Sequence, residues 1–154
     1  MSDDYTIYVT VEGDYHIDQD AVWWAAWYAL QAGGAEAPIA IGVTVTTDEQ
    51  IRDLNHDYAG IDEVTDVLSF PADAEPYNVE PDEPPYFGDV IIAYPTAERQ
   101  ASERGHTVHN ELQMLTIHGA LHLLGYDHDS PDNKAIMWAL ESSAMDALRE
   151  NGQA

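Results

Sequence analysis

Residues 118–128 read His-Gly-Ala-Leu-His-Leu-Leu-Gly-Tyr-Asp-His, a helical pair of histidines followed by a turn and a third histidine. Residues four apart lie on the same face of an α-helix, so His118 and His122 can direct two imidazoles toward one ion. Gly125 can then adopt the left-handed conformation that ends a helix and reverses the chain. After that reversal, His128 can supply a third nitrogen. The spacing therefore predicts a metal site with three protein ligands.

Three protein ligands leave a fourth coordination position open, which is the arrangement of a catalytic zinc site and not of a closed structural one. Zinc can lower the pKa of a bound water to about 7, which gives hydroxide at neutral pH. The sequence has no cysteine, so thiolate ligands are excluded. We expect one Zn2+ ion, although three imidazoles also suit nickel, copper or cobalt. Two histidines four apart are often plain surface residues, and it is the third one that favours a metal.

The residue beside the first histidine decides which chemistry the site can support. The spacing H-x-x-x-H-x-x-G-x-x-H is that of the metzincin proteases. Those enzymes place a glutamate next to the first histidine as the general base, whereas this chain has Gly119 there. The standard mechanism of peptide hydrolysis then lacks its proton acceptor. A hydrolase of peptides or small molecules is therefore the least favoured of three functional hypotheses.

Around this segment the sequence predicts alternating strands and helices. Runs rich in β-branched and aromatic residues predict strands, and capping residues and glycines delimit helices. We expect strands at 5–11, 38–46, 65–70 and 87–94, and helices at 18–32, 47–58, 95–105, 110–124 and from 130 onward. In the helix that carries the histidines, Asn110 is the predicted cap and Glu111 lies in the first turn. Trp23, Trp24, Trp27 and Leu30 are interpreted as core residues.

The predicted class is α+β, because strands dominate the first half of the chain and helices the second. We expect a small mixed sheet of about four strands packed with about five helices, with the metal-site helix central. The chain of 154 residues is predicted to form a single domain, residues 1–154. Residues 72–86 hold five acidic residues and four prolines, which is typical of a long, mobile loop.

The charge of the chain is strongly negative, with five Lys and Arg against 29 Asp and Glu, or a formal −24. Such a charge repels nucleic acid at moderate salt. Adaptation to a salty cytoplasm is one explanation, because molar salt shortens the Debye length to about 3 Å; an acidic surface that aids solubility is the other. An acidic N-terminus, no long apolar run and no cysteine predict a cytoplasmic protein that does not enter a membrane.

With these residues in view, the chain resembles the YbeY family of bacterial endoribonucleases. The family signature H-G-x-L-H-L-x-G-Y-D-H is matched in full by residues 118–128. A second motif, L-N-x-x-(Y/F)-R-x-x-D-x-P-T-(D/N)-V-L-S-F-P, is matched by Leu54, Asn55, Tyr58, Asp62 and residues 65–71. A third, G-D-(I/V)-x-I, appears at residues 88–92. The three motifs occur in the family order, and because the order of the predicted elements also agrees, the resemblance extends over nearly the whole chain.

The resemblance implies a metal-dependent endoribonuclease specific for single-stranded RNA. Members of the family act in maturing small-subunit ribosomal RNA, notably at its 3′ end, and in ribosome quality control. The resemblance further implies a zinc ion on the three histidines. The partners it implies are ribosomal RNA, the small ribosomal subunit and a ribosomal protein or an assembly GTPase.

Two positions of the second motif depart from the family. Ala59 stands where the family has arginine, and Val64 where it has proline. A guanidinium beside the metal would clamp a phosphate or stabilise the charge that develops on it, and alanine can do neither. Arg52 and His56 are the candidate substitutes. The loss favours a second hypothesis, a ribosome-assembly or ribosome-binding factor whose zinc is mainly structural and whose nuclease activity is weak or lost.

Three further polar residues are candidates for the site. Asp66 and Ser69 are predicted catalytic residues near the metal; alternatively, Asp66 caps a turn and Ser69 satisfies a backbone group. Asp127 is predicted to accept a hydrogen bond from a ligand imidazole, or else to lie on the surface of the turn.

Overall fold

The computed structural model describes residues 5–72 and 84–154. In chain order its elements are β1 (Tyr5–Val11), α1 (Gln19–Ala32), β2 (Ile39–Thr46), α2 (Asp48–Ala59), β3 (Val67–Pro71), β4 (Tyr86–Ala93), α3 (Tyr94–Arg104), α4 (Val108–Leu123) and α5 (Pro131–Glu150). The predicted α+β class is confirmed. Most of the predicted mobile loop at 72–86 lies outside the described residues, and its last residue, Tyr86, begins β4.

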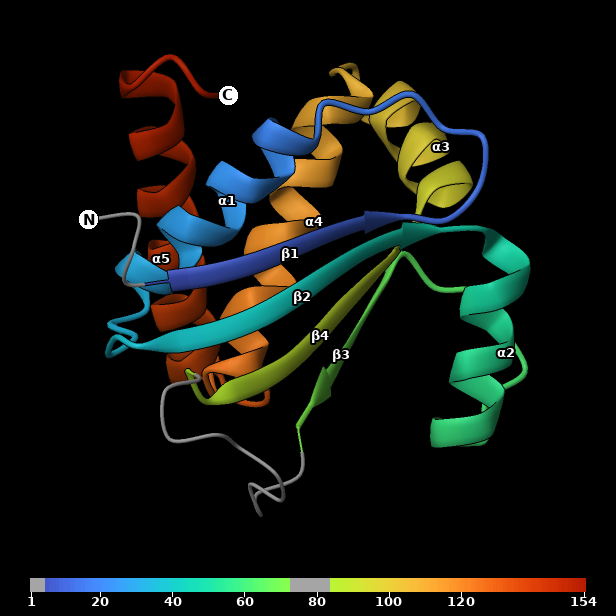
Figure 1. The fold of residues 1–154 in the computed structure, drawn as a ribbon, viewed down its shortest axis with the longest axis horizontal. Helices are drawn as coiled ribbons and strands as arrows, with labels where there is room; N and C mark the ends of the chain where they lie inside the picture. Colours follow the sequence, from blue (N-terminus) through green and yellow to red (C-terminus); the bar gives the residue numbers. More distant parts are fainter. Residues whose placement is uncertain (1–4, 73–83) are drawn as a thin grey trace.

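The four strands form one mixed sheet in the order β1-β2-β4-β3. β1 and β4 both run parallel to β2, whereas β3 pairs with β4 in the antiparallel direction, with Ser69 opposite Val90. β3 is therefore an edge strand of the sheet. Figure 1 shows the twisted sheet crossing in front of α1 and α4, with α2 at the end of the sheet.

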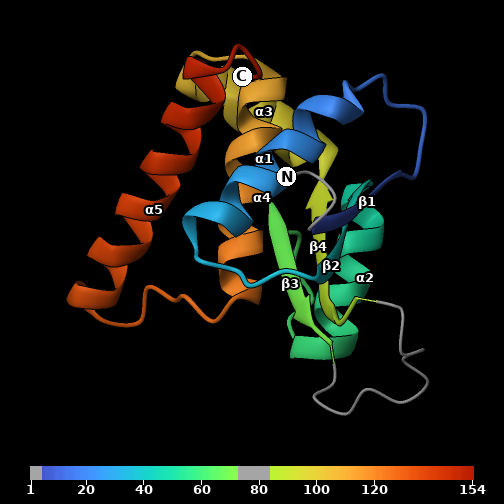
Figure 2. The same cartoon turned by 60° about the vertical axis from the view of Figure 1, so that its left-hand side comes forward.

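Helix α4 is the centre of the molecule. It packs against α1, α3 and α5 and against strands β3 and β4, and Figure 2 shows it between the sheet and α5. Its apolar positions, Leu112, Ile117 and Leu121, are fully buried. This arrangement confirms the prediction that the histidine-bearing helix is central, and it holds that helix rigidly against the edge of the sheet. Among the described helices, none is long and apolar enough to cross a membrane.

The start of α4 differs from the sequence prediction. The cap is Thr107, whose side chain accepts a hydrogen bond from the backbone N–H of Asn110 at 3.0 Å. Asn110 itself lies inside the first turn. Glu111 is fully buried and contacts Arg104 at 2.7 Å and His106 at 2.6 Å. α4 begins at Val108, two residues earlier than predicted, and Glu111 lies in its first turn, as predicted.

The aromatic residues of α1 lie at the border of the core. Leu30 is fully buried, as predicted. Trp23, Trp24 and Trp27 are only partly buried and pack against the core. They pack against one another edge to face, with ring centroids 5.0 Å apart for Trp23 and Trp24 and 5.9 Å apart for Trp24 and Trp27. The smaller Ala25, Ala26 and Ala29 are also fully buried, and α1 packs closely against α4.

Candidate metal centre

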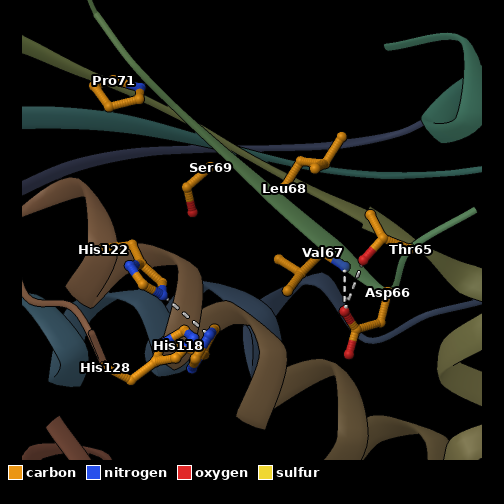
Figure 3. Close-up of a pocket in the computed structure, with 9 residues that line it drawn as sticks. All are labelled: Thr65, Asp66, Val67, Leu68, Ser69, Pro71, His118, His122 and His128. Atoms are coloured by element: carbon orange, nitrogen blue, oxygen red, sulfur yellow. Dashed lines mark hydrogen bonds between the residues drawn. The ribbon is translucent and has the colours of Figure 1, made fainter. Parts of the chain in front are cut away.

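The three predicted histidines come together in the structure (Figure 3). His118 and His122 lie one turn apart on α4, and their Nε2 atoms are 3.1 Å apart. His128 joins them from the segment after the helix. One ring nitrogen from each of the three side chains lies within 4.8 Å of the others. Such convergence of three imidazole nitrogens fits a single metal ion.

The turn that brings His128 to the helix is anchored at Tyr126. α4 ends at Leu123, and Gly125 follows with a φ of +101°, a conformation that favours glycine. The backbone N–H of Tyr126 then bonds to the carbonyl of Leu121 at 3.1 Å. The Tyr126 hydroxyl donates to the carbonyl of Gly33, just after α1, at 2.8 Å. The third histidine is thus held by packing against α1 as well as by the glycine turn.

A carboxylate from a distant helix orients one of the histidines. Oε1 of Glu141, on α5, lies 3.0 Å from Nδ1 of His118. A metal-binding histidine usually makes such a bond with its other nitrogen, because it fixes the tautomer and leaves Nε2 for the ion. Glu141 lies outside the histidine motif. Its spacing in the sequence does indicate that it faces inward, because Glu141 lies four positions from both Met137 and Met145, which are buried on α5.

Asp127 agrees with the second of its two interpretations, an exposed residue of the turn, and it makes no hydrogen bond to a ligand imidazole. Its Oδ1 accepts the backbone N–H of His128 at 2.7 Å, and the same oxygen is 3.7 Å from Nδ1 of His128. The first distance is a hydrogen bond and the second is too long for one. Asp127 therefore stabilises the turn, and Glu141 is the carboxylate that bonds to a ligand imidazole.

The environment of His122 favours its neutral form. Burial lowers the pKa of His122, and the neighbouring His118 and His128 lower it further. Neutral imidazole is the form that binds a metal. The donor set, its convergence and this charge state together fit a divalent ion such as zinc.

A pocket of about 530 Å³ opens in front of the histidines. One wall is His118, His122 and His128; the other is the segment that leads into and along β3, including Asp66, Leu68 and Ser69. Figure 3 shows Ser69 on the side of the strand that faces the histidines. A pocket of this size beside three converging imidazoles has room for a substrate group.

Asp66 and Ser69 line this pocket and also make the local contacts considered from the sequence. Oδ1 of Asp66 accepts the backbone N–H of Val67 at 2.8 Å, so it caps the start of β3. The Ser69 hydroxyl donates to the carbonyl of Gly119 at 3.0 Å, which ties β3 to α4. These contacts place both side chains at the pocket. Their catalytic roles stay predictions.

At Gly119, α4 packs closely against β3 and β4. A Cβ at this position would lie 2.5 Å from Cγ1 of Val90 and 3.2 Å from Oγ of Ser69. There is consequently no space for the glutamate that metzincins carry here. The missing general base is a result of how tightly this helix packs on β4.

The two candidate substitutes for the family arginine do not line the pocket. Arg52 forms two hydrogen bonds to Asp62, at 2.8 Å and 3.1 Å. His56 is exposed and lies 3.4 Å from Asp57. The other cations are also engaged: Arg99 with Asp48, Arg104 with Glu111, Arg149 with Asp146, and Lys134 over the ring of Trp138. Among the described lining residues, the pocket has no lysine or arginine to meet a phosphate.

Fold and site together define a small α+β protein with a three-histidine candidate metal pocket at the edge of its sheet. The sequence model of the family described as Endoribonuclease YbeY matches residues 14–149. This chain therefore belongs to the Endoribonuclease YbeY family.

Individual relatives agree with this assignment. A protein named Endoribonuclease YbeY from Chloroflexus aggregans is 42% identical over 147 residues, which cover 94% of this chain and 96% of that protein. One of the same name from Dehalococcoides mccartyi is 43% identical over 130 residues, covering 79% of this chain and 81% of the relative. The solution structure of a protein from Thermotoga maritima shares the fold, with a TM-score of 0.61 at 24% identity over 96% of this chain and 95% of that one.

Proposed function

We propose that this chain is a metal-dependent endoribonuclease that cleaves single-stranded RNA, with zinc as its metal. The observation that carries the proposal is the convergence of three imidazole nitrogens beside an open pocket, in a chain that belongs to this family. The proposed substrate is small-subunit ribosomal RNA, cleaved during maturation of its 3′ end and in ribosome quality control. The proposed compartment is the cytoplasm.

We assign the following roles to the residues in and next to the pocket. His118, His122 and His128 hold the ion, and Glu141 orients the first of them. A bound zinc ion would supply Lewis-acid chemistry, polarising a phosphate oxygen and lowering the pKa of water. The Ser69 hydroxyl donates a hydrogen bond to the Gly119 carbonyl, so the lone pairs of its oxygen are available to accept a hydrogen bond in the pocket. Asp66 is the lining carboxylate among the described residues, and we assign it as the proton acceptor.

A second candidate function has its own supporting observation. No lysine or arginine is found among the described residues that line the pocket, and Ala59 stands in the position of the family arginine. A ribosome-assembly factor with a mainly structural zinc needs no such cation. Its proposed partners are the small ribosomal subunit and a ribosomal protein or an assembly GTPase.

Cleavage of a 3′ fragment of small-subunit ribosomal RNA tests the proposal. The assay uses protein of measured zinc content at low and at molar potassium chloride, with His122→Ala beside it. His56→Ala is the matched control, because His56 is exposed and outside the pocket. We expect wild type and His56→Ala to cleave and His122→Ala to fail.

The outcomes separate the two candidate functions. If zinc-loaded wild type cleaves nothing at either salt concentration, the nuclease proposal is wrong. Thermal unfolding with and without a chelator then examines the alternative. A structural zinc predicts a large loss of stability on chelation and an equal loss in His122→Ala, whereas a catalytic zinc predicts mainly a loss of turnover.

A further inference from the structure

An aromatic pair with one exposed ring packs on β3, the strand whose Leu68, Ser69 and Pro71 line the candidate metal pocket. Tyr58, in the last turn of α2, has 73% of its surface exposed. Its ring packs against that of Phe70 on β3, with centroids 5.1 Å apart and planes inclined by 56°. Phe70 is partly buried. The Tyr58 ring is thus held by a tilted contact with Phe70, while most of the tyrosine side chain is open to solvent. Two further apolar side chains, Ile61 and Val64, are exposed in the connection from α2 to β3.

The geometry of β3 links this pair to the pocket. Successive side chains of a strand point to opposite faces. Ser69 faces α4, since it bonds to Gly119 there, so Leu68 and Phe70 face the other side. Leu68 lines the pocket, and Figure 3 shows it pointing away from the histidines. Because β3 is the edge of the sheet, a chain leaving the pocket can cross this edge and reach Phe70 and Tyr58.

The charges at this surface argue against recognition through phosphates. Arg52, the cation on α2, is bound to Asp62 through both oxygens of that carboxylate, and the net charge of the protein is −24. Phosphate contacts by lysine and arginine supply most of the affinity of ordinary nucleic-acid binding. Stacking of bases on aromatic rings is the other general source, and it tolerates any sequence. An exposed tyrosine can supply base stacking where cations that contact phosphates are missing.

We propose that Tyr58, supported by Phe70, is the stacking platform for an unpaired base next to the phosphate held in the metal pocket. The inference rests on the proposed function and specifies how its substrate is bound. A base in a duplex is already stacked and paired, so the platform selects single-stranded RNA. Binding through it survives molar salt, because stacking does not depend on attraction to phosphates.

The test is fluorescence-anisotropy binding of a labelled single-stranded RNA at molar potassium chloride. Every protein carries His122→Ala to prevent cleavage. Tyr58→Leu keeps an apolar side chain and removes the ring, whereas Tyr58→Phe keeps the ring. Tyr8→Leu is the matched control, because Tyr8 is 58% exposed and lies on β1, the opposite edge strand. We expect Tyr58→Leu to weaken binding about tenfold, and Tyr58→Phe and Tyr8→Leu to change it less than twofold.

Several outcomes would overturn the inference. Unchanged binding by Tyr58→Leu would show that the ring is not used, and an equal loss in Tyr58→Phe or Tyr8→Leu would show that stacking at this position is not the cause. Failure of the background protein to bind single-stranded RNA at any salt concentration also overturns it. The cleavage assay on wild type separates the two proposals: cleavage combined with unchanged binding by Tyr58→Leu overturns the platform alone, whereas absent cleavage overturns the nuclease function.

Discussion

The Oε1 atom of Glu141 lies 3.0 Å from Nδ1 of His118 and so determines which nitrogen of that imidazole faces the other two histidines. Loss of such a partner typically weakens metal affinity by about 10- to 100-fold. We expect Glu141→Ala to lower zinc affinity within this range, and Glu141→Gln, which keeps an acceptor oxygen but not the charge, to lower it less. Competition against a chromophoric chelator measures both constants.

A control on the same helix distinguishes orientation of the ligand from a general effect of charge. Glu150 is exposed at the end of α5, and Glu150→Gln removes the same charge far along the helix from His118. Its zinc affinity should equal that of wild type. Equal losses in Glu141→Gln and Glu150→Gln would mean that the overall negative charge attracts the ion, and that Glu141 has no particular role.

At the scale of elements, the start of α4 provides a test of which residue is the cap. The side chain of Thr107 bonds to the backbone N–H of Asn110, so Thr107→Ala leaves that donor without its partner. We expect a loss of about 1 kcal/mol in the free energy of unfolding, the usual cost of removing a cap. Asn110→Ala should cost much less, since Asn110 lies within the first turn. Urea denaturation of both variants decides between them, and the reverse order would restore Asn110 as the cap.

The contact between α4 and β4 at Gly119 gives a second prediction about packing. In Gly119→Ala the new Cβ would lie 2.5 Å from Cγ1 of Val90, so the helix or the valine has to move. Overpacking of this kind costs about 1–3 kcal/mol. Val90→Ala removes the clashing methyl groups, and the double variant should be less destabilised than the sum of the two single ones. Additive losses in urea denaturation would show that the contact is not tight.

Some features of the fold and the site can be predicted from local sequence patterns, and others depend on tertiary packing. The order and the approximate positions of the strands and helices follow from local patterns and are confirmed for the described residues. The convergence of the three histidines also follows from such a pattern, and the structure shows it. Thr107 and Asn110 are both residue types that cap helices well, so residue type alone does not choose between them, and the structure uses Thr107. Glu141 is 23 residues from His118, so only the packing of α5 against α4 brings it to the site.

At the scale of the whole molecule, the distribution of charge bears on both stability and function. Each arginine forms an ion pair with a carboxylate, and Lys134 lies over the ring of Trp138. Because the chain has 29 Asp and Glu against five Lys and Arg, these pairs leave a large excess of negative charge. Mutual repulsion among such charges destabilises a compact state, and salt reduces it, because the Debye length falls from about 10 Å at 0.1 M to about 3 Å at 1 M.

We accordingly expect the melting temperature to rise between 0.1 M and 1 M potassium chloride. A variant with Glu12→Gln, Glu103→Gln and Glu150→Gln separates screening of charge from other effects of salt, because these glutamates are exposed and lie on separate parts of the fold. It should melt higher than wild type at 0.1 M, and the difference should shrink at 1 M as repulsion is screened in both proteins. Calorimetry at the two concentrations measures this. An equal difference at both would mean that repulsion does not limit stability, and the acidic surface would then be explained by solubility.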